Sequence, residues 1–215
     1  YDGQGFMVPK KLGVKSAKEL DGASVCIQTG TTTELNLAEF FAGNNMKYNP
    51  VPIETNAEAQ ELYKAGRCDV YTTDASGLYA TKMSFDNPSA HVVLPEIVSK
   101  EPLGPVVRHG DDQWADIVSW VLRAMMSAEE KGITSKNVKK LAAQDNKDKE
   151  INRLLGKDPL QGLSKLGLSA DWAVNVISQV GNYAESFERN LYPLTIVRGM
   201  NALYRDGGLH YIPPI

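Results

Sequence analysis

Residues 25–34 read VCIQTGTTTE and join an apolar strand to a helix through one glycine and three threonines. Gly30 permits a sharp backbone turn, and a threonine can cap the helix that follows. The N–H groups of the first helical turn, together with the positive end of the helix dipole, favour an anion. The hydroxyls of Thr31, Thr32 and Thr33 favour a small carboxylate over a polyphosphate, because no Walker lysine follows them. A simple capped helix start is the alternative for this segment.

A second segment, AGRCDVYTTD at residues 65–74, has the complementary charge. A helix ends at Gly66, a strand follows, and Asp74 comes just beyond the carboxyl end of that strand. Ligands of open α/β sheets bind outside the carboxyl ends of strands. If the two strands are neighbours, donors for a carboxylate and a carboxylate for an ammonium face one crevice, which suits an α-amino acid. The alternative for Asp74 is an N-cap of the helix that starts at Ala75.

The first part of the chain, residues 6–98, alternates strand and helix patterns, and this spacing predicts a parallel α/β sheet. We expect strands over residues 6–9, 23–28, 48–53, 68–72 and 91–94, and helices over residues 16–20, 32–42, 57–65 and 75–82.

The second part, residues 99–215, is predicted to be almost entirely helical after one more strand at Pro105–Arg108. Apolar residues from Trp114 to Met125 recur at the spacing of one buried helix face. A further long amphipathic helix is expected from a cap at Ser169 through Phe187. Such faces normally cover a sheet. We therefore expect that the strands covering these helices are missing from this chain.

The composition is that of an ordinary soluble protein: 215 residues, 42% hydrophobic and 23% charged. The net charge of −3 argues against nucleic acid or an anionic membrane as a partner. No apolar run reaches the length of about 18 residues that spans a bilayer. The chain opens on Tyr1 rather than methionine, so we expect a processed product or a fragment.

Cysteines and histidines offer little support for enzymatic chemistry. Cys26 and Cys68 each lie in or beside a predicted strand, so a disulfide is possible if these strands are neighbours. Two buried free thiols are the alternative. The three histidines lack the spacing of metal ligands, and none lies beside a nucleophile in a known motif. We therefore expect no metal, no cofactor and no enzymatic activity.

Taken together, these motifs resemble a known family. The order of strand, GTT and helix, followed by AGRxDV, a strand and an aspartate, resembles the second lobe of periplasmic amino-acid-binding proteins of ABC transporters. KEPLG at residues 100–104 is similar to the returning interlobe crossover, and EEKGIT at residues 129–134 to the C-terminal region. The cysteine pair and RGMNALY at residues 198–204 resemble most closely the general L-amino acid branch.

The resemblance implies a type II periplasmic-binding-protein fold of the α/β class. It implies that residues 1–5 form the first interlobe crossover and that residues 6–98 form a complete lobe 2. Residues 99–215 would then hold the second crossover and the helical C-terminal part of an incomplete lobe 1. It also implies that Cys26 and Cys68 form a disulfide.

The same resemblance assigns roles to individual residues. Thr32 and Thr33 would hold the α-carboxylate of the ligand, with Thr31 closing the loop. Asp74 would bind the α-ammonium, and Gln28 and Thr73 would touch the ligand side chain. The implied function is capture of L-amino acids in the periplasm for an ABC permease in the inner membrane.

The chain departs from the family because most of lobe 1 is absent. We therefore expect weakened or lost ligand binding by this chain alone, because a half-site loses the closure that sequesters ligand. Uncovered apolar helices in residues 113–190 predict self-association into a homo-oligomer. Two alternatives are an enzyme on the same fold, such as a dehydratase, and a degenerate oligomeric remnant that transports nothing.

Overall fold

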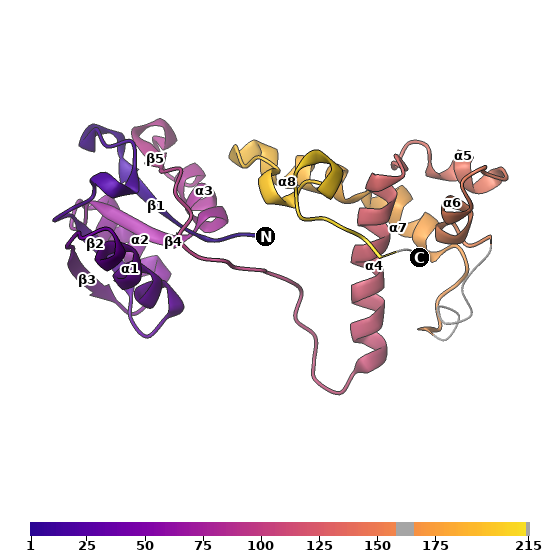
Figure 1. Cartoon of the computed structure of the whole chain (residues 1–215), viewed down its shortest axis with the longest axis horizontal. Coiled ribbons are helices and arrows are strands. Elements are labelled where there is room, and N and C mark those ends of the chain that lie inside the picture. Colours follow the sequence, from indigo (N-terminus) through magenta and orange to yellow (C-terminus); the bar gives the residue numbers. More distant parts are fainter. Residues whose placement is uncertain (158–165, 214–215) are drawn as a thin grey trace. The chain divides into compact units, whose positions relative to one another are not determined.

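Apolar strands from the first part of the chain build one five-stranded sheet in the computed structural model, which describes residues 1–157 and 166–213 (Figure 1). The strands are β1 (Gln4–Pro9), β2 (Ser24–Gln28), β3 (Asn49–Ile53), β4 (Val70–Asp74) and β5 (His91–Val93). Their order across the sheet is β3-β2-β4-β1-β5. β2 runs parallel to both β3 and β4, whereas β1 runs antiparallel to β4 and β5.

The expectation of a parallel sheet is therefore correct for β2, β3 and β4 and wrong for β1. Strand and helix alternation fixes the direction only of strands that are joined by a crossover helix. The link from β1 to β2 holds instead two short 3-10 turns, at Lys10–Leu12 and Ala17–Glu19. No crossover helix therefore fixes the direction of β1, which lies in the sheet between β4 and β5, two strands that follow it in sequence.

Three helices cover the two faces of the sheet: α1 (Thr32–Gly43), α2 (Asn56–Lys64) and α3 (Ala75–Met83). Successive residues of a strand point to opposite faces. Accordingly, Phe6 of β1 packs in a core with Phe41 of α1. Its neighbour Met7 packs in a second core with Tyr63 of α2 and Leu78 of α3. The result is a three-layer α/β/α arrangement that leaves the strand ends open.

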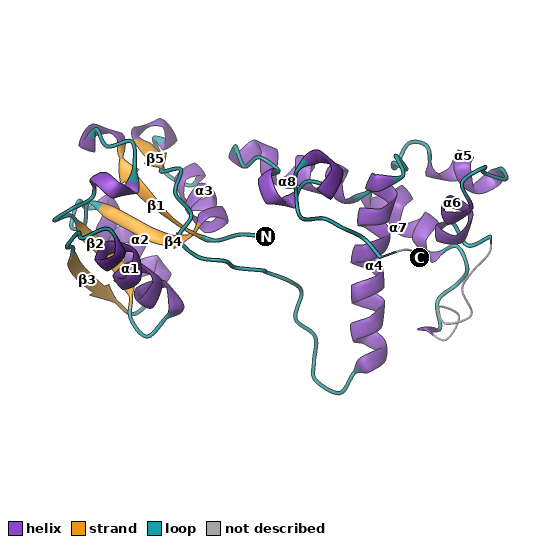
Figure 2. Cartoon of the chain, viewed as in Figure 1, coloured by secondary structure: helices purple, strands orange, loops and turns teal. Residues whose placement is uncertain are grey.

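Residues 104–157 and 166–213 form helices that pack on one another. They are α4 (Asp112–Glu130), α5 (Val138–Ala143), α6 (Lys149–Leu154), α7 (Trp172–Val180) and α8 (Tyr183–Leu191), and short 3-10 turns follow at Tyr192–Leu194, Gly199–Asn201 and Tyr204–Asp206. Ala124, Ala128, Ile133 and Ile177 are among the residues of a core that α4, α5, α6 and α7 share. Figure 2 shows the strands confined, among the described residues, to the first part of the chain.

The strand expected at Pro105–Arg108 is wrong, because the structure has an extended loop there. Val106 is 97% exposed, so its β-branched side chain has no sheet face to cover. Pro105 also has no N–H to donate to a ladder. No strand in the described residues of this part of the chain could pair with the segment.

The single long helix expected from Ser169 through Phe187 is also wrong, because α7 and α8 are separate. Gly181 adopts a φ of +90°, a backbone conformation that interrupts the helix. The next residue, Asn182, starts α8 with a capping box: its side chain accepts from the Glu185 N–H, and the Glu185 carboxylate accepts from the Asn182 N–H, both at 2.9 Å. The Ser135 N–H and hydroxyl also donate to Glu185, which ties α8 to the start of the α5 segment.

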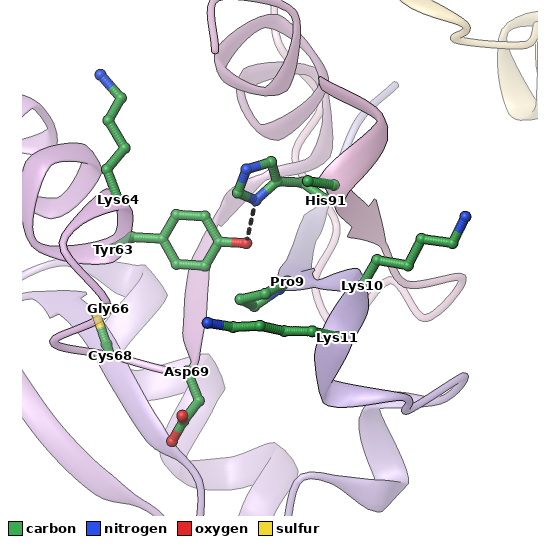
Figure 3. A pocket seen from close by; sticks show the side chains of 10 residues that line it. Pro9, Lys10, Lys11, Tyr63, Lys64, Gly66, Cys68, Asp69 and His91 are labelled. Carbon is green, nitrogen blue, oxygen red and sulfur yellow. Dashed lines mark hydrogen bonds between the residues drawn. The ribbon is translucent and has the colours of Figure 1, made fainter. Parts of the chain in front are cut away.

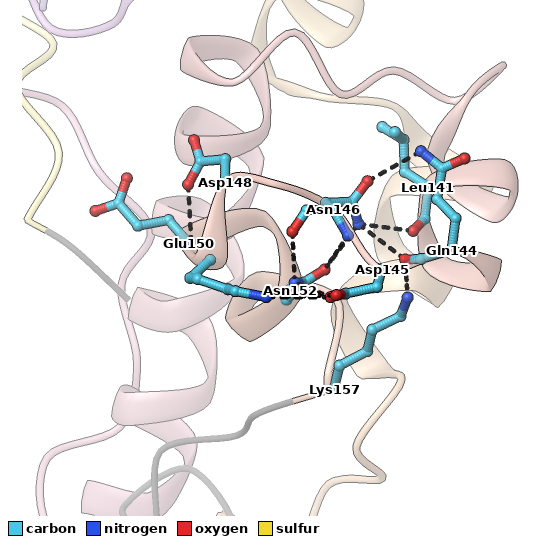
Figure 4. Close-up of polar contacts among 9 residues, drawn as sticks. Leu141, Gln144, Asp145, Asn146, Asp148, Glu150, Asn152 and Lys157 are labelled. Carbon is cyan, nitrogen blue, oxygen red and sulfur yellow. Dashed lines mark hydrogen bonds and ion pairs between the residues drawn. The ribbon is translucent and has the colours of Figure 1, made fainter.

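A polar network orders the link between α5 and α6 (Figure 4). Asn146 and Asn152 are both buried, and the Asn152 amide donates to the Asn146 carbonyl and to the Asp145 carboxylate. In return the Asn146 N–H and side-chain amide donate to Oδ1 of the Asn152 side chain. Buried polar side chains are thereby satisfied within the loop, which fits a role in structure.

The structure divides into two compact units, Tyr1–Leu103 and Gly104–Ile215. The first unit contains residues 1–5 and extends to residue 103. Assignment of the two units to lobes and crossovers stays a prediction. None of the helices that the structure describes is long and apolar enough to cross a membrane.

Candidate functional site

The threonine loop lies at the carboxyl end of β2, where it leads into α1. Gly30 has a φ of +71°, and its N–H donates to the Glu34 carboxylate at 2.8 Å. The Thr31 hydroxyl donates to the Gln28 carbonyl at 2.8 Å, so it fastens the loop rather than capping the helix. These two bonds close the turn and set the first turn of α1 at the edge of the sheet.

The first turn of α1 carries donors that are available to a ligand. Thr32 is exposed and Thr33 is half-buried. Among the described residues, neither the N–H groups nor the hydroxyls of these two threonines have a hydrogen-bond partner. Because the helix dipole is positive at this end, the turn is suited to a carboxylate.

Asp74 ends β4 and stands at the N-cap position of α3, but its side chain makes no capping bond. Asp2 takes the cap instead, accepting from the Ser76 N–H at 3.3 Å and the Ser76 hydroxyl at 2.5 Å. Burial, and then the negative charges of Asp2 and Glu101, raise the pKa of Asp74. A half-buried carboxylate among like charges gains from a bound cation such as an ammonium.

The two loops lie at the same edge of the sheet. β2 and β4 are adjacent and parallel, with Val25 opposite Val70 and Cys26 opposite Tyr71. Their carboxyl ends therefore reach the same side, and the threonine loop and Asp74 belong to neighbouring strand ends. Loops on opposite edges of the sheet could not share one ligand, and these two loops lie on the same edge.

The two remaining candidates, Gln28 and Thr73, differ in their contacts with the rest of the protein. Both side chains are half-buried. The Gln28 amide donates to the Glu54 carbonyl at 2.9 Å, so this side chain leans toward the start of α2. Thr73 lies opposite Gly5 in the β1–β4 ladder, directly before Asp74. Contact of either with a ligand side chain stays a prediction.

Gln4 is a residue of this region that the sequence analysis missed. It is only 1% exposed and lies opposite Asp74 in the β1–β4 ladder. Its amide nitrogen donates to the Thr33 carbonyl at 3.1 Å and to the Thr72 hydroxyl oxygen at 2.9 Å. Gln4 therefore joins the threonine loop to the strand that carries Asp74.

The orientation of the Gln4 amide follows from its partners. The Thr33 carbonyl can only accept, and the Thr72 hydroxyl already donates its proton to the Gly5 carbonyl at 2.7 Å. Both neighbours need a donor, so the nitrogen faces them. The Gln4 carbonyl oxygen is buried and has no partner among the described residues.

A disulfide between Cys26 and Cys68 joins β2 to the segment that enters β4, with the two Cα atoms 5.6 Å apart. The disulfide expected from the family resemblance is confirmed, and the alternative of two free thiols is wrong. Both cysteines are buried in the core beside Met7 and Tyr71. The bond thus fixes together the two strands whose ends carry the candidate site.

Comparison with known proteins shows to which family the chain belongs. No protein-family model matches it. It is 57% identical over 219 aligned positions to the General L-amino acid-binding periplasmic protein AapJ of Rhizobium johnstonii, and 55% identical over 217 positions to the Glutamate/glutamine/aspartate/asparagine-binding protein BztA of Rhodobacter capsulatus. The solved structure of an ABC transporter periplasmic binding protein from Brucella ovis with glutathione bound is 52% identical. It aligns with a TM-score of 0.91, covering 99% of this chain and 68% of that one. The chain belongs to the periplasmic binding proteins of ABC transporters.

Membership of the periplasmic binding proteins confirms the α/β fold and the family expected from the sequence. These relatives are binding proteins rather than enzymes, which also confirms the non-enzymatic function class. The chain spans 64% of the length of both curated relatives, each of which aligns with the whole of it. The comparisons name no site residue, so the roles of the threonine loop and Asp74 rest on the geometry above.

Proposed function

We propose that this chain supplies amino-acid-binding loops of a periplasmic binding protein that serves an ABC transporter. The α-carboxylate of the ligand binds the N–H groups and hydroxyls of Thr32 and Thr33, in a loop closed by Thr31. The α-ammonium binds Asp74, and Gln28 and Thr73 contact the ligand side chain. The observation that carries the proposal is the position of both loops at the ends of adjacent parallel strands.

The charges of the two loops support an α-amino acid over other small ligands. An ammonium relieves the repulsion that Asp74 meets from Asp2 and Glu101. A carboxylate meets the unpaired first-turn donors of α1. A ligand with only one of these groups leaves one loop without its partner, so the site favours a zwitterion.

The names of the two curated relatives support L-amino acids, glutamate and glutamine among them, as the ligand class. They also support a periplasmic location and an ABC permease as partner. Weak binding by the chain alone and self-association into a homo-oligomer, which light scattering would detect, stay predictions.

Isothermal titration of the 215-residue chain with L-glutamate and L-glutamine, carried to millimolar ligand, tests the proposal. Asp74→Asn is expected to weaken binding at least about tenfold, because a charge-assisted hydrogen bond is lost. Asp86→Asn is the matched control, since Asp86 is exposed in the loop after α3 and outside the site.

A second ligand distinguishes the contribution of Asp74 from that of the threonine loop. Glutarate keeps both carboxylates of glutamate but lacks the α-ammonium, so its affinity should not fall in Asp74→Asn. Equal loss of glutamate affinity in Asp74→Asn and Asp86→Asn, or no loss in either, would contradict the role of Asp74.

A further inference from the structure

A cavity of about 500 Å³ lies at the opposite end of β4 from the candidate amino-acid site (Figure 3). Four segments of the first unit line it: the end of β1 with the following 3-10 turn, the end of α2, the segment entering β4, and the start of β5. Its volume is within the range of small-molecule sites. Nothing in the proposed amino-acid binding uses these residues.

The wall of the cavity is apolar and fixed in place. Tyr63 is 2% exposed, and its hydroxyl lies 2.8 Å from Nδ1 of His91. Pro9 and Ala90 add apolar surface, and Cys68 of the disulfide completes this side. A wall held by a disulfide and by a part-buried side-chain hydrogen bond is preformed, which lowers the ordering cost of binding.

The protonation of the Tyr63–His91 pair follows from its surroundings. Burial raises the pKa of Tyr63, so the phenol keeps its proton and carries no charge. Burial, and then the charge of Lys82, lower the pKa of His91. The imidazole is therefore neutral at pH 7 and adds no positive charge to the cavity.

The charge of the cavity comes from lysine. In the view of Figure 3 the Lys11 side chain extends across the cavity, with its ammonium drawn below the Tyr63 ring and above Asp69, whereas Lys10 and Lys64 point away. Within residues 1–157 and 166–213, no carboxylate lies within ion-pair distance of Lys11. The Asp69 carboxylate is held by the Ser24 N–H and hydroxyl, at 2.9 and 2.6 Å.

We propose that this cavity is a second ligand site, for a small organic monoanion with an apolar body. The carboxylate pairs with the Lys11 ammonium, and the apolar body lies on Pro9 and Ala90, which Tyr63 supports from within the core. One ammonium directed into the cavity matches one negative charge, and the apolar wall disfavours a phosphate, which needs donors on several sides.

Three probes of one shape test the charge preference: 2-naphthoate, neutral 2-naphthamide and cationic 2-naphthylmethylamine. They are titrated into the ¹⁵N-labelled full chain and followed by NMR. We expect 2-naphthoate to shift the amide signals of Lys11, Ala90 and His91, and to bind about tenfold more tightly than the amide. Equal affinities, or shifts confined to other residues, would overturn the proposal.

A pair of variants tests the role of Lys11 itself. Lys11→Glu should weaken 2-naphthoate about tenfold, whereas Lys15→Glu, an equal charge change at an exposed lysine outside the cavity, should leave it within about twofold. Unaltered NMR dispersion shows that both variants fold. Equal effects of the two variants would overturn the proposal.

A competition experiment distinguishes this site from the proposed amino-acid site. L-Glutamate at 10 mM should leave the 2-naphthoate shifts unchanged, because the two sites lie at opposite ends of β4. Displacement of 2-naphthoate by L-glutamate would place both ligands in one site and overturn the inference.

Discussion

Replacing Gln4 by glutamate should destabilise the protein strongly and replacing it by methionine should change stability little, although both side chains match glutamine in size. In Gln4→Glu an oxygen takes the place of the nitrogen and faces the Thr33 carbonyl and the Thr72 hydroxyl oxygen, both of which need a donor. An uncompensated acceptor or charge, buried at 1% exposure, should lower the free energy of unfolding by about 3 kcal/mol or more.

Gln4→Met removes the same two hydrogen bonds, each worth about 1 kcal/mol net. It also removes the buried carbonyl oxygen that has no partner among the described residues, whose desolvation costs about 1–3 kcal/mol. These terms oppose each other, so the free energy of unfolding of Gln4→Met should stay within about 1 kcal/mol of the original. The methionine variant should nevertheless loosen the threonine loop, because nothing then joins the Thr33 carbonyl to β4.

Urea unfolding followed by NMR signals of the first unit is the appropriate assay, because the chain has two units and all three tryptophans lie in the second. Hydrogen exchange of the Thr32 and Thr33 amides reports on the loop. Destabilisation of Gln4→Met as large as that of Gln4→Glu would refute the assigned amide orientation. Unchanged stability in both variants would refute the connecting role of Gln4.

Three further predictions concern the disulfide and two carboxylates. Reduction of Cys26–Cys68 reopens a loop with a sequence separation of 42 and should destabilise the first unit by about 4 kcal/mol; an unchanged urea midpoint in dithiothreitol would contradict this. Burial alone would raise the pKa of Glu185, but hydrogen bonds from Ser135 and Asn182 outweigh it and lower the pKa. The stability that Glu185 contributes is therefore present above its unfolded pKa and is lost as the pH falls through its folded pKa. When the free energy of unfolding is measured at decreasing pH, it should fall less steeply in Glu185→Gln than in the original protein. Burial, Asp2 and Glu101 raise the pKa of Asp74, so on acidification glutamate affinity should begin to fall at a higher pH than it would with an ordinary aspartate. Calorimetry at a series of pH values measures this, and an affinity that does not change with pH would contradict the prediction.

Local signals predicted most of the elements of the first unit. Gly30 and Gly66 mark a loop and a helix end, and the apolar runs beside them are strands β2 and β4 of the structure. Helical crossovers impose parallel strands, so the sequence predicted that Asp74 and the threonine loop share one crevice on the condition that their strands are neighbours. The structure supplies that condition, because β2 and β4 are adjacent. The direction of β1 carries no such signal and was not predictable.

The second unit shows how a periodic pattern can mislead. Apolar residues from Trp172 to Phe187 keep the helical spacing across Gly181, so the pattern alone indicates one helix. The break depends on the positive φ of Gly181 and on the contact of Glu185 with Ser135, 50 residues earlier. Contacts over such distances are not visible in a local window.

Gln4 and the second cavity were missed for the same reason. The partners of Gln4 lie 29 and 68 residues away, and a single glutamine in an apolar strand has no distinctive pattern. The cavity draws on four segments whose residues are individually ordinary surface lysines and core aromatics. Only the sheet order β3-β2-β4-β1-β5 brings either set together.

The disulfide has one more consequence, for limited proteolysis. Residues 27–67, which hold the threonine loop, α1, β3 and α2, form a ring closed by Cys26 and Cys68. Asn45 and Lys47 lie exposed in the connection from α1 to β3, where a protease can reach the backbone. A single nick there leaves two pieces that migrate as one band on a gel without reductant and separate once the bond is reduced.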